Sequence, residues 1–364
     1  MGQTILASFR WLGFGFLDPL VKLFQGIEPK KNGALFLKKA IIPILSIAIF
    51  LGVANFFSSY LYNIERERKI EKTRETQGDE AALAMQECID SGDISCKPNS
   101  LPSPADVWRA TQTLIADHRM ISTDKAEFKT RTAAVNAQRH AQGLSSIRYT
   151  GRPSFVDQIF TSLKTVFAGF LLAAFLAIPA GIVLGLSETL RTALNWIIQI
   201  FKPVSPVVWL LLVSMVVKTI LASADMDKSF VISFISVGLC SMWATLVNTS
   251  VGVSSVDKDY LNVSKVLRLG VVSNVFKVIL PSSVPLIFTG LRITLSVAWM
   301  VLIAIELLAQ SPGLGSFVWE EFQNGANDSN AKIIVAMFVI GGIGFALDRL
   351  MMLVQKAVSY ESKA

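Results

Sequence analysis

The chain has 364 residues, of which 52% are hydrophobic and only 17% are charged. Soluble domains carry about 25% charged residues, so this composition argues against an ordinary soluble protein. Uncharged windows at residues 40–63, 165–187 and 229–256 run for 24, 23 and 28 residues. A membrane core of about 30 Å takes roughly 20 such residues as a helix. We therefore predict an all-α, polytopic membrane protein.

The N-terminal segment, residues 1–39, is basic and rich in aromatic residues. Arg10 and Lys22 interrupt an otherwise apolar stretch, which predicts a helix that lies along the membrane surface and bends or ends at Pro19. A disordered lead is the alternative. The first span follows at residues 40–63, and its length and position argue against a cleaved signal peptide.

Residues 64–157 form a polar segment between the first span and the remaining ones. Residues 65–75 alternate in charge, which predicts a solvated helix that continues out of the membrane. A turn-rich break is expected at residues 97–104. Cys88 and Cys96 enclose a short loop, so a disulfide is expected if this segment faces an oxidising compartment. Two free thiols are the alternative.

Five further apolar windows bring the expected number of spans to six. They lie at residues 158–186, 193–217, 229–249, 284–309 and 333–354. Pro203 and Pro206 are expected to disturb the beginning of the third span. Gly181 and Gly185 are four residues apart, and this spacing permits close contact between helices.

The short loops indicate the orientation of the chain. Residues 1–39, the loop at 253–283 and the tail from Arg349 carry an excess of Lys and Arg, whereas residues 310–330 carry three acids and no Lys or Arg. The positive-inside rule therefore places both termini, including the tail at residues 355–364, and the loop in the cytoplasm. The segment at 64–157 then faces the periplasm of a bacterial inner membrane.

The loop at residues 253–283 has the pattern of a short amphipathic helix. Its apolar positions at helical spacing are Val256, Tyr260, Val263 and Leu267. Gly270 is expected to end this helix in a left-handed cap, and Pro281 and Pro285 are expected to mark the return to the membrane. Such a helix could seat in a groove of a soluble partner. An ordinary loop helix is the alternative.

Patterns for catalysis and metal binding are missing from the sequence. It contains no phosphate-binding G-x-x-x-x-G-K-[ST] motif and no G-x-S-x-G nucleophile motif. It also contains no Cys/His pairing of the kind that binds zinc. We expect this chain not to be an enzyme, and we expect it to hold no metal and no cofactor and to bind no nucleic acid.

Several short motifs, by their order and spacing, resemble those of a known family. They are Leu101-Pro102-Ser103-Pro104 with Val107-Trp108, Phe201-Lys202-Pro203-Val204-Ser205-Pro206 with Trp209, Leu269-Gly270 to Leu280-Pro281, Gly290-Leu291-Arg292, Ala298-Trp299, Glu306-Leu307 and Gly313-Leu314-Gly315. Over residues 101–354 the chain resembles the nitrate/sulfonate/taurine group of binding-protein-dependent ABC importer permeases. Residues 257–263 and 319–325 most resemble nitrate permeases.

The resemblance implies a type I (MetI-like) importer permease fold, with a five-helix core at residues 158–354. It also implies a permease homodimer surrounded by membrane lipid, two separate ABC subunits that bind ATP and Mg²⁺, and a periplasmic solute-binding protein. The loop at 253–283 would couple the chain to those ATPases. The residues assigned to coupling are Asp257, Asp259, Tyr260, Lys265, Arg268, Leu269, Gly270 and Pro281.

The translocation path is expected near a few residues inside the spans. They are Trp209, Trp299, Arg292 and Glu306. Arg292 lies near the cytoplasmic end of the fifth span and either lines an anion path, extends to the interface or braces the loop. Glu306 is expected to brace the outer gate by hydrogen bonds. The tryptophans, Trp243 included, fit the path, interface anchoring and helix packing alike.

Nitrate is the expected solute, with sulfonate or taurine and bicarbonate as alternatives. A stand-alone secondary transporter or channel is the alternative from another class. It would show inverted repeats or several ionisable residues at mid-membrane, and the sequence shows neither. A membrane-bound enzyme with its site in residues 64–157 is a third alternative, which the missing acid–base and metal patterns oppose.

Overall fold

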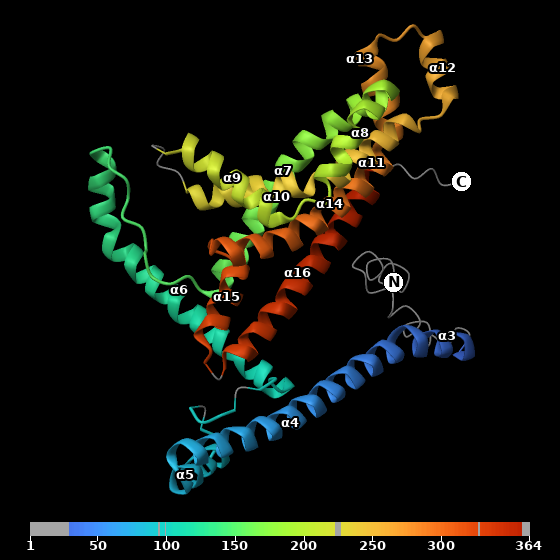
Figure 1. Cartoon of the computed structure of the whole chain (residues 1–364). Helices are drawn as coiled ribbons and strands as arrows, with labels where there is room; N and C mark the ends of the chain where they lie inside the picture. Colours follow the sequence, from blue (N-terminus) through green and yellow to red (C-terminus); the bar gives the residue numbers. More distant parts are fainter. Residues whose placement is uncertain (1–28, 94, 99, 223–226, 327, 359–364) are drawn as a thin grey trace. The chain divides into compact units, whose positions relative to one another are not determined.

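A computed structural model shows the chain as an all-α protein (Figure 1). It describes residues 29–358 except 94, 99, 223–226 and 327, and these ranges contain no strand. The surface helix predicted around Pro19 lies outside the described residues. The contacts divide the chain into two units, Met1–Arg109 with Ala326–Ala331, and Ala110–Gly325 with Lys332–Ala364. The predicted all-α architecture is confirmed.

The first unit is dominated by one long helix that carries the first candidate span. Its elements are α3 (Pro29–Phe36), the π-helical turn η2 (Leu37–Ile41), α4 (Ile42–Gln77) and α5 (Asp79–Asp90). Helix α4 continues from the apolar window through the charged residues 65–75, as predicted. Gly78 (φ +90°) ends α4, and α5 packs back against it. The ion pair between Arg66 and Asp90 (2.5 Å) joins these two helices.

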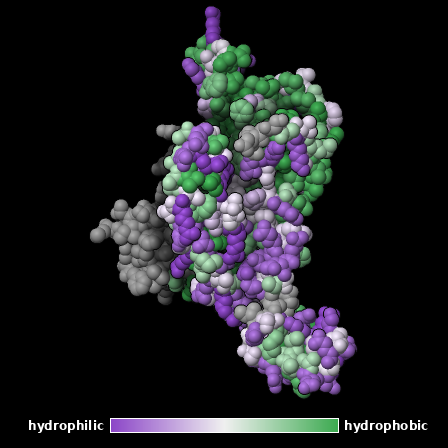
Figure 2. All heavy atoms as spheres, turned by 90° about the vertical axis from the view of Figure 1, so that its left-hand side faces the viewer, coloured by the Kyte–Doolittle hydropathy of each residue, from purple (hydrophilic) through white to green (hydrophobic). Residues whose placement is uncertain are grey.

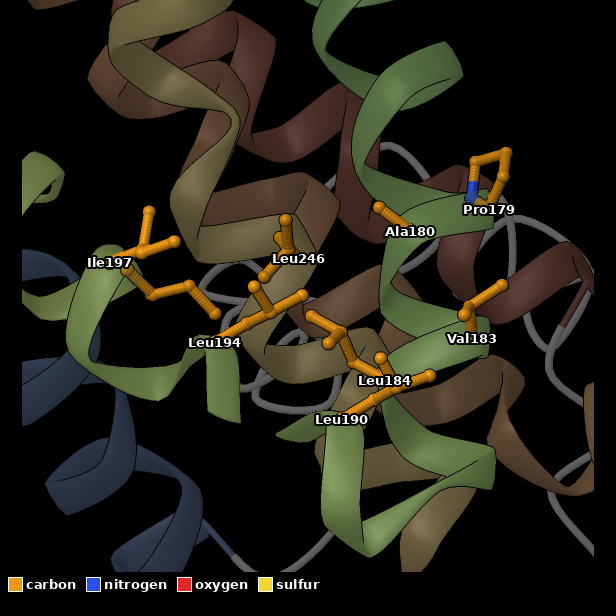
Figure 3. A pocket seen from close by; sticks show the side chains of 9 residues that line it. Pro179, Ala180, Val183, Leu184, Leu190, Leu194, Ile197 and Leu246 are labelled. Atoms are coloured by element: carbon orange, nitrogen blue, oxygen red, sulfur yellow. The ribbon is translucent and has the colours of Figure 1, made fainter. Parts of the chain in front are cut away.

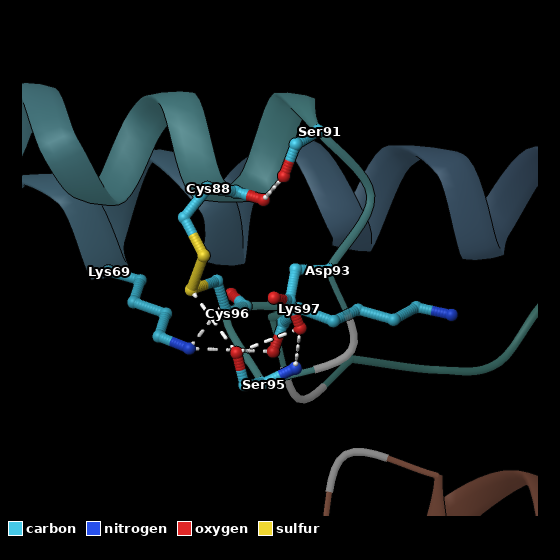
Figure 4. The surroundings of a disulfide bond; sticks show 7 residues. All are labelled: Lys69, Cys88, Ser91, Asp93, Ser95, Cys96 and Lys97. Atoms are coloured by element: carbon cyan, nitrogen blue, oxygen red, sulfur yellow. Dashed lines mark hydrogen bonds between the residues drawn. A yellow bond between two sulfur atoms is a disulfide. The ribbon is translucent and has the colours of Figure 1, made fainter.

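A disulfide joins Cys88 in α5 to Cys96 in the following turn, with the Cα atoms 5.8 Å apart (Figure 4). Lys69 of α4 donates hydrogen bonds to the carbonyl oxygens of Cys96 (3.0 Å) and Lys97 (3.4 Å). A disulfide stabilises mainly by restricting the unfolded chain. The bond and Lys69 together hold the turn against both helices.

Asp106 caps the start of α6 (Pro104–Ala141), which follows the predicted break. Its carboxylate accepts hydrogen bonds from Lys97 Nζ (2.6 Å) and from the Ser103 hydroxyl (2.8 Å) and amide (3.0 Å). Burial alone would raise the pKa of Asp106, but these hydrogen bonds outweigh it and hold the pKa below its usual value. The ionised Asp106 carboxylate therefore stabilises the folded protein at neutral pH, and this contribution is lost as the pH falls through the lowered pKa.

The second unit contains the remaining helices. They are α7 (Phe155–Leu186), α8 (Glu188–Phe201), α9 (Pro206–Ile220), α10 (Lys228–Ser241), α11 (Trp243–Ser254), α12 (Lys258–Val266), α13 (Val271–Asn274), the π-turn η3 (Val275–Ile279), α14 (Leu280–Ala309), α15 (Leu314–Asn324) and α16 (Ser329–Val358). Across the described residues five helical stretches are long and apolar enough to cross a membrane, or six if the pair α8 and α9 counts as one. Figure 2 shows hydrophobic side chains gathered over broad areas of one face, as lipid-facing segments require.

The predicted span at residues 193–217 is not one continuous helix, because α8 and α9 meet at a 99° bend. Pro203 in the bend has no amide hydrogen to donate, and Ser205 has the extended backbone angles (φ −59°, ψ 142°) that are favoured before a proline, here Pro206. Pro206 then begins α9, where the Ser205 hydroxyl accepts a hydrogen bond from the Val207 amide. The proline pair therefore breaks this span in its middle rather than at its beginning.

The helix that carries the predicted fifth span begins before residue 284. A continuous helical stretch of 39 residues, Val271–Ala309, combines α13, η3 and α14. Pro281 and Pro285 therefore lie within this stretch and do not interrupt it. The π-turn η3 widens the helix around Lys277, whose carbonyl the ring of Pro281 would otherwise meet.

Small residues let α7 pack closely along α10 and α11. A Cβ atom on Gly181 would lie 2.6 Å from the Cβ of Thr249, and one on Gly185 would lie 2.5 Å from the Cβ of Val253. Both distances are shorter than real Cβ contacts. The close helix contact that the spacing predicted is therefore confirmed, in the manner of small residues at membrane helix interfaces.

Helix α6 is fastened to the start of α7 by polar contacts within the second unit. Ser154 and Asp157 form a capping box at the N-terminus of α7. His118 Nδ1 lies 2.8 Å from the Ser154 hydroxyl, and Lys125 Nζ donates to Asp157 Oδ2 at 2.5 Å. The long polar helix α6 is thereby held to the point where the apolar helix α7 begins.

The glycine contact on α7 gives a testable prediction. Gly181→Ala should lower the free energy of unfolding by about 1–3 kcal/mol, because the added methyl group overpacks the contact with Thr249. Gly341→Ala in α16 is the matched control, because the added Cβ atom would meet no described atom within 4 Å. In a helix interior alanine is more stable than glycine by about 0.5–1 kcal/mol. Thermal unfolding of the purified protein in detergent checks both, and equal effects would contradict the close packing.

Candidate functional site

The loop between α11 and α14 forms a short helix with well-defined ends. The Asp257 carboxylate accepts a hydrogen bond from the Asp259 amide (3.0 Å) and caps α12, as an N-cap residue does. The C-terminal end is closed by Arg268, which has a left-handed φ of +50°. The Arg268 amide donates a hydrogen bond to the Lys265 carbonyl (3.0 Å), and the Leu269 amide donates one to the Ser264 carbonyl (3.1 Å).

The predicted left-handed cap at Gly270 is therefore wrong. Gly270 has φ −64° and ψ 160°, an extended conformation that any residue can adopt, and it precedes α13. A Cβ atom at this position would meet no described atom within 4 Å. The chain reverses two residues earlier, at Arg268, so the turn does not depend on glycine.

Residues 257–276, called the docking segment below, present apolar side chains to the outside. Val266 is 81% exposed and Leu267 is 64% exposed. The other exposed apolar side chains of the segment are Tyr260, Val263, Val271, Val272 and Phe276. The buried Ser264 hydroxyl donates to Asn274 Oδ1 (2.7 Å) and fixes α12 to α13. The segment is thus a preformed apolar surface of the kind that marks an interaction site.

The structure brings most of the predicted coupling residues together on this segment. They are Asp257, Asp259, Tyr260, Lys265, Arg268, Leu269 and Gly270. Pro281 lies outside the segment, in the first turn of α14, and is exposed.

Arg292 of α14 is engaged by a partner that the sequence analysis missed. Its Nε donates to Asp348 Oδ1 (2.5 Å) and its Nη2 donates to Asp348 Oδ2 (2.9 Å), which makes a bidentate pair between α14 and α16. The side chains remain 40% and 28% exposed. A single acid inside the apolar sequence of α16 was the available signal, because such a charge requires a partner.

The tryptophans separate into two groups. Trp299 is buried and its Nε1 donates to the Ile340 carbonyl of α16 (3.0 Å), so it serves helix packing. The rings of Trp209 and Trp243 instead lie on the ring of Phe201, with centroid distances of 5.9 and 6.2 Å. The Nε1 atoms of these two are buried and have no hydrogen-bond partner among the described residues.

An apolar groove of about 390 Å³ lies between α7, α8 and α11 (Figure 3). Its lining includes Val183, Leu190, Leu194 and Leu246. Every lining residue is apolar, so the groove offers neither charge nor donor to an anion. It is therefore not a binding site for a small polar solute.

Glu306 near the end of α14 is 1% exposed and is the centre of a polar cluster. Ser162 Oγ of α7 lies 2.7 and 2.8 Å from its two carboxylate oxygens and donates to them. The Gly315 amide donates to Oε2 (2.9 Å), and the Leu314 amide donates to Ser162 Oγ (2.9 Å). We call Glu306, Ser162 and residues 313–315 the outer cluster, after the side of the membrane that the positive-inside rule predicts for residues 310–330.

Two glycines make room for the outer cluster. A Cβ atom on Gly313 would overlap the Glu306 carboxyl group, and one on Gly315 would overlap the carbonyl oxygen of Ile303. The sequence analysis singled out Glu306 and these glycines but missed Ser162, which no local pattern distinguishes from other serines of the chain.

Comparison with known proteins identifies the family of this chain. Residues 169–360, which include the docking segment, Arg292 and Glu306, match the family described as binding-protein-dependent transport system inner membrane component. The chain belongs to this family. The predicted resemblance to importer permeases is thereby confirmed.

Relatives with assigned names point to one part of the family. The nitrate import permease protein NrtB of Synechococcus elongatus is 38% identical over 206 residues, which cover 57% of this chain and 71% of the relative. The bicarbonate transport system permease protein CmpB of Synechocystis is 37% identical over 203 residues, 56% of this chain and 68% of the relative. A solved structure of the MetNI methionine ABC transporter, inward facing, has a TM-score of 0.48 and 16% identity, and it covers 56% of this chain and 95% of that chain.

The Arg292–Asp348 pair gives a second prediction. Arg292→Leu and Asp348→Leu should each destabilise the protein, because each leaves one charge without its partner in an apolar region. The double variant should be less destabilised than the sum of the two, by about 0.5–3 kcal/mol. Thermal unfolding in detergent measures this coupling, and strictly additive effects would show that the two side chains do not support each other.

Proposed function

We propose that this protein is the membrane subunit of an ATP-driven importer for a small oxyanion, with nitrate as the first candidate and bicarbonate as the second. The observation that carries the proposal is the docking segment, a preformed apolar surface in a chain that belongs to a family of importer permeases. Alkanesulfonates such as taurine are the third candidate.

The exposed side chains of the docking segment support an external partner. A protein surface that has no partner seldom exposes several large apolar side chains on one short segment, as here Val266, Leu267 and Val271, because exposed apolar patches favour association. A short amphipathic helix with fixed ends fits a groove in a soluble subunit. We therefore propose that two ABC subunits, which bind ATP and Mg²⁺, dock here and drive inward- and outward-open states of the spans.

The solute is proposed from the named relatives. Nitrate and bicarbonate are the solutes named for NrtB of Synechococcus elongatus and CmpB of Synechocystis. Both are small planar anions with one negative charge, so a path made for one suits the other in size and charge. Nitrate is preferred because the residues at 257–263 and 319–325 most resemble nitrate permeases.

The assembly is proposed from the family. Its description as the inner membrane component of a binding-protein-dependent system supports a solute-binding protein that delivers the anion from the periplasm. We propose that two copies of this chain form the path in a bacterial inner membrane, with both termini in the cytoplasm.

The docking segment gives a third prediction. Leu267→Asp should prevent the ATPase from co-purifying and should abolish uptake, because it places a charge in the middle of the apolar surface. Loss of a central contact residue costs about 2 kcal/mol or more of binding free energy. Val135→Asp on α6 is the matched control, since Val135 is also exposed but lies far along the chain from the docking segment. Equal ATPase recovery from the two variants would contradict this docking surface.

Solute-stimulated ATP hydrolysis gives a fourth prediction, which tests the function itself. The permease, its ATPase and its binding protein are reconstituted in liposomes, and hydrolysis and uptake are measured with nitrate, bicarbonate and taurine. Nitrate should stimulate both most strongly. Transport by the isolated permease without ATPase would instead support a secondary transporter or channel.

A further inference from the structure

The helix that follows the docking segment ends in the outer cluster, at the opposite end of α14 (Figure 1). We propose that Glu306 is a positioning residue that fastens α15 to the outer end of α14, so that movement started at the docking segment reaches α15. This inference rests on the proposed function, because it takes the docking segment as the place where an ATPase acts.

The first step of the argument is the start of α15. The first amides of a helix have no partner within the helix. No side chain of the preceding turn caps α15. Instead the Leu314 amide binds Ser162 and the Gly315 amide binds Glu306. The start of α15 is therefore held by α7 and α14, and a carboxylate suits the positive end of a helix dipole.

The second step is the closeness of this contact. Any side chain at position 313 or 315 would displace Glu306 or the backbone of α14 at Ile303. The two glycines thus bring the backbone of α15 directly against α14. A packed contact of this kind transmits a displacement of α14 to α15, because protein interiors are close-packed and have low compressibility.

The third step is the length of the connecting helix. Val271–Ala309 is one helical stretch, so residues 271–276 of the docking segment lie on the same element as Glu306. At a rise of 1.5 Å per residue, residues 271 and 306 are about 53 Å apart. A tilt of this helix at its inner end therefore moves Glu306, and through it α15.

The fourth step is the chemistry that holds the contact. Glu306 accepts hydrogen bonds and forms no ion pair with a described residue. Glutamine keeps an oxygen for the Gly315 amide and offers an amide to Ser162, whereas alanine keeps neither. Glu306→Gln should therefore preserve the function of the contact and Glu306→Ala should remove it.

This proposal gives the fifth prediction, which uses a reporter on α15. Phe322 in α15 is exposed, and Phe322→Cys in a Cys240→Ala background is labelled with a maleimide in nanodiscs that hold the complete complex. With Glu306 intact, the labelling rate should differ at least about fivefold between nucleotide-free and ATP-bound complexes. Glu306→Ala should reduce this difference below about twofold, while Glu306→Gln should retain it.

ATP hydrolysis and uptake in liposomes separate positioning from mere assembly. Glu306→Ala should retain hydrolysis and lose uptake by about 5- to 100-fold, so that more ATP is spent per ion. Ser162→Ala, which removes one hydroxyl only, should likewise retain hydrolysis and lower uptake, but to a smaller extent than Glu306→Ala. Glu320→Ala is the control, since it removes an exposed carboxylate of α15 outside the outer cluster and should leave both unchanged.

Three outcomes would overturn the proposal. The first is a nucleotide-dependent labelling difference that persists in Glu306→Ala. The second is a loss of uptake, hydrolysis and assembled complex in equal proportion. The third needs no substituted Glu306: a labelling rate of the Phe322→Cys reporter that does not respond to nucleotide while the contact is intact. If no tested anion is taken up, the solute assignment fails, but the labelling experiment still decides the role of Glu306.

Discussion

A polar group inside a membrane-spanning region has no water to bind, and most of the contacts described here follow from that constraint. The Glu306 carboxylate is held by Ser162 and by the start of α15. The charged Arg292 donates two hydrogen bonds, from Nε and Nη2, to the two carboxylate oxygens of Asp348. Each of these contacts joins two different helices, so the need for partners decides which helices lie together. The glycines of α7 then allow close approach where no polar contact is required.

The helical stretch Val271–Ala309 organises the functional features of the second unit. Its N-terminal end follows a short helix with exposed apolar side chains, and Glu306 lies near its C-terminal end. Helix α9, which follows the 99° bend, packs against α14. At the bend Phe201 lies against Trp209 and Trp243, whose N–H groups have no hydrogen-bond partner in the described part of the chain.

The first unit adds features that lie outside the residues matched by the family. Its long helix α4 carries a span and then a charged extension, to which α5 is fixed by Arg66 and by the turn that Cys88 and Cys96 close. Its own core is small, and a small fold gains proportionally more from a covalent link. The cap at Asp106 adds a charge-assisted contact that persists at neutral pH.

The sequence alone determined the features that depend on neighbouring residues. Runs of apolar residues predicted the spans, the alternating charges at 65–75 predicted the extension of α4, and the pair Gly181 and Gly185 predicted a close helix contact. Features that join distant residues required the tertiary structure, because local patterns do not name a partner. Ser162 and Glu306 are 144 positions apart, and Arg292 and Asp348 are 56 apart. The bend before Pro206 and the left-handed residue at Arg268 instead of Gly270 were also decided there, since each depends on which of several permitted backbone paths lets the flanking helices pack.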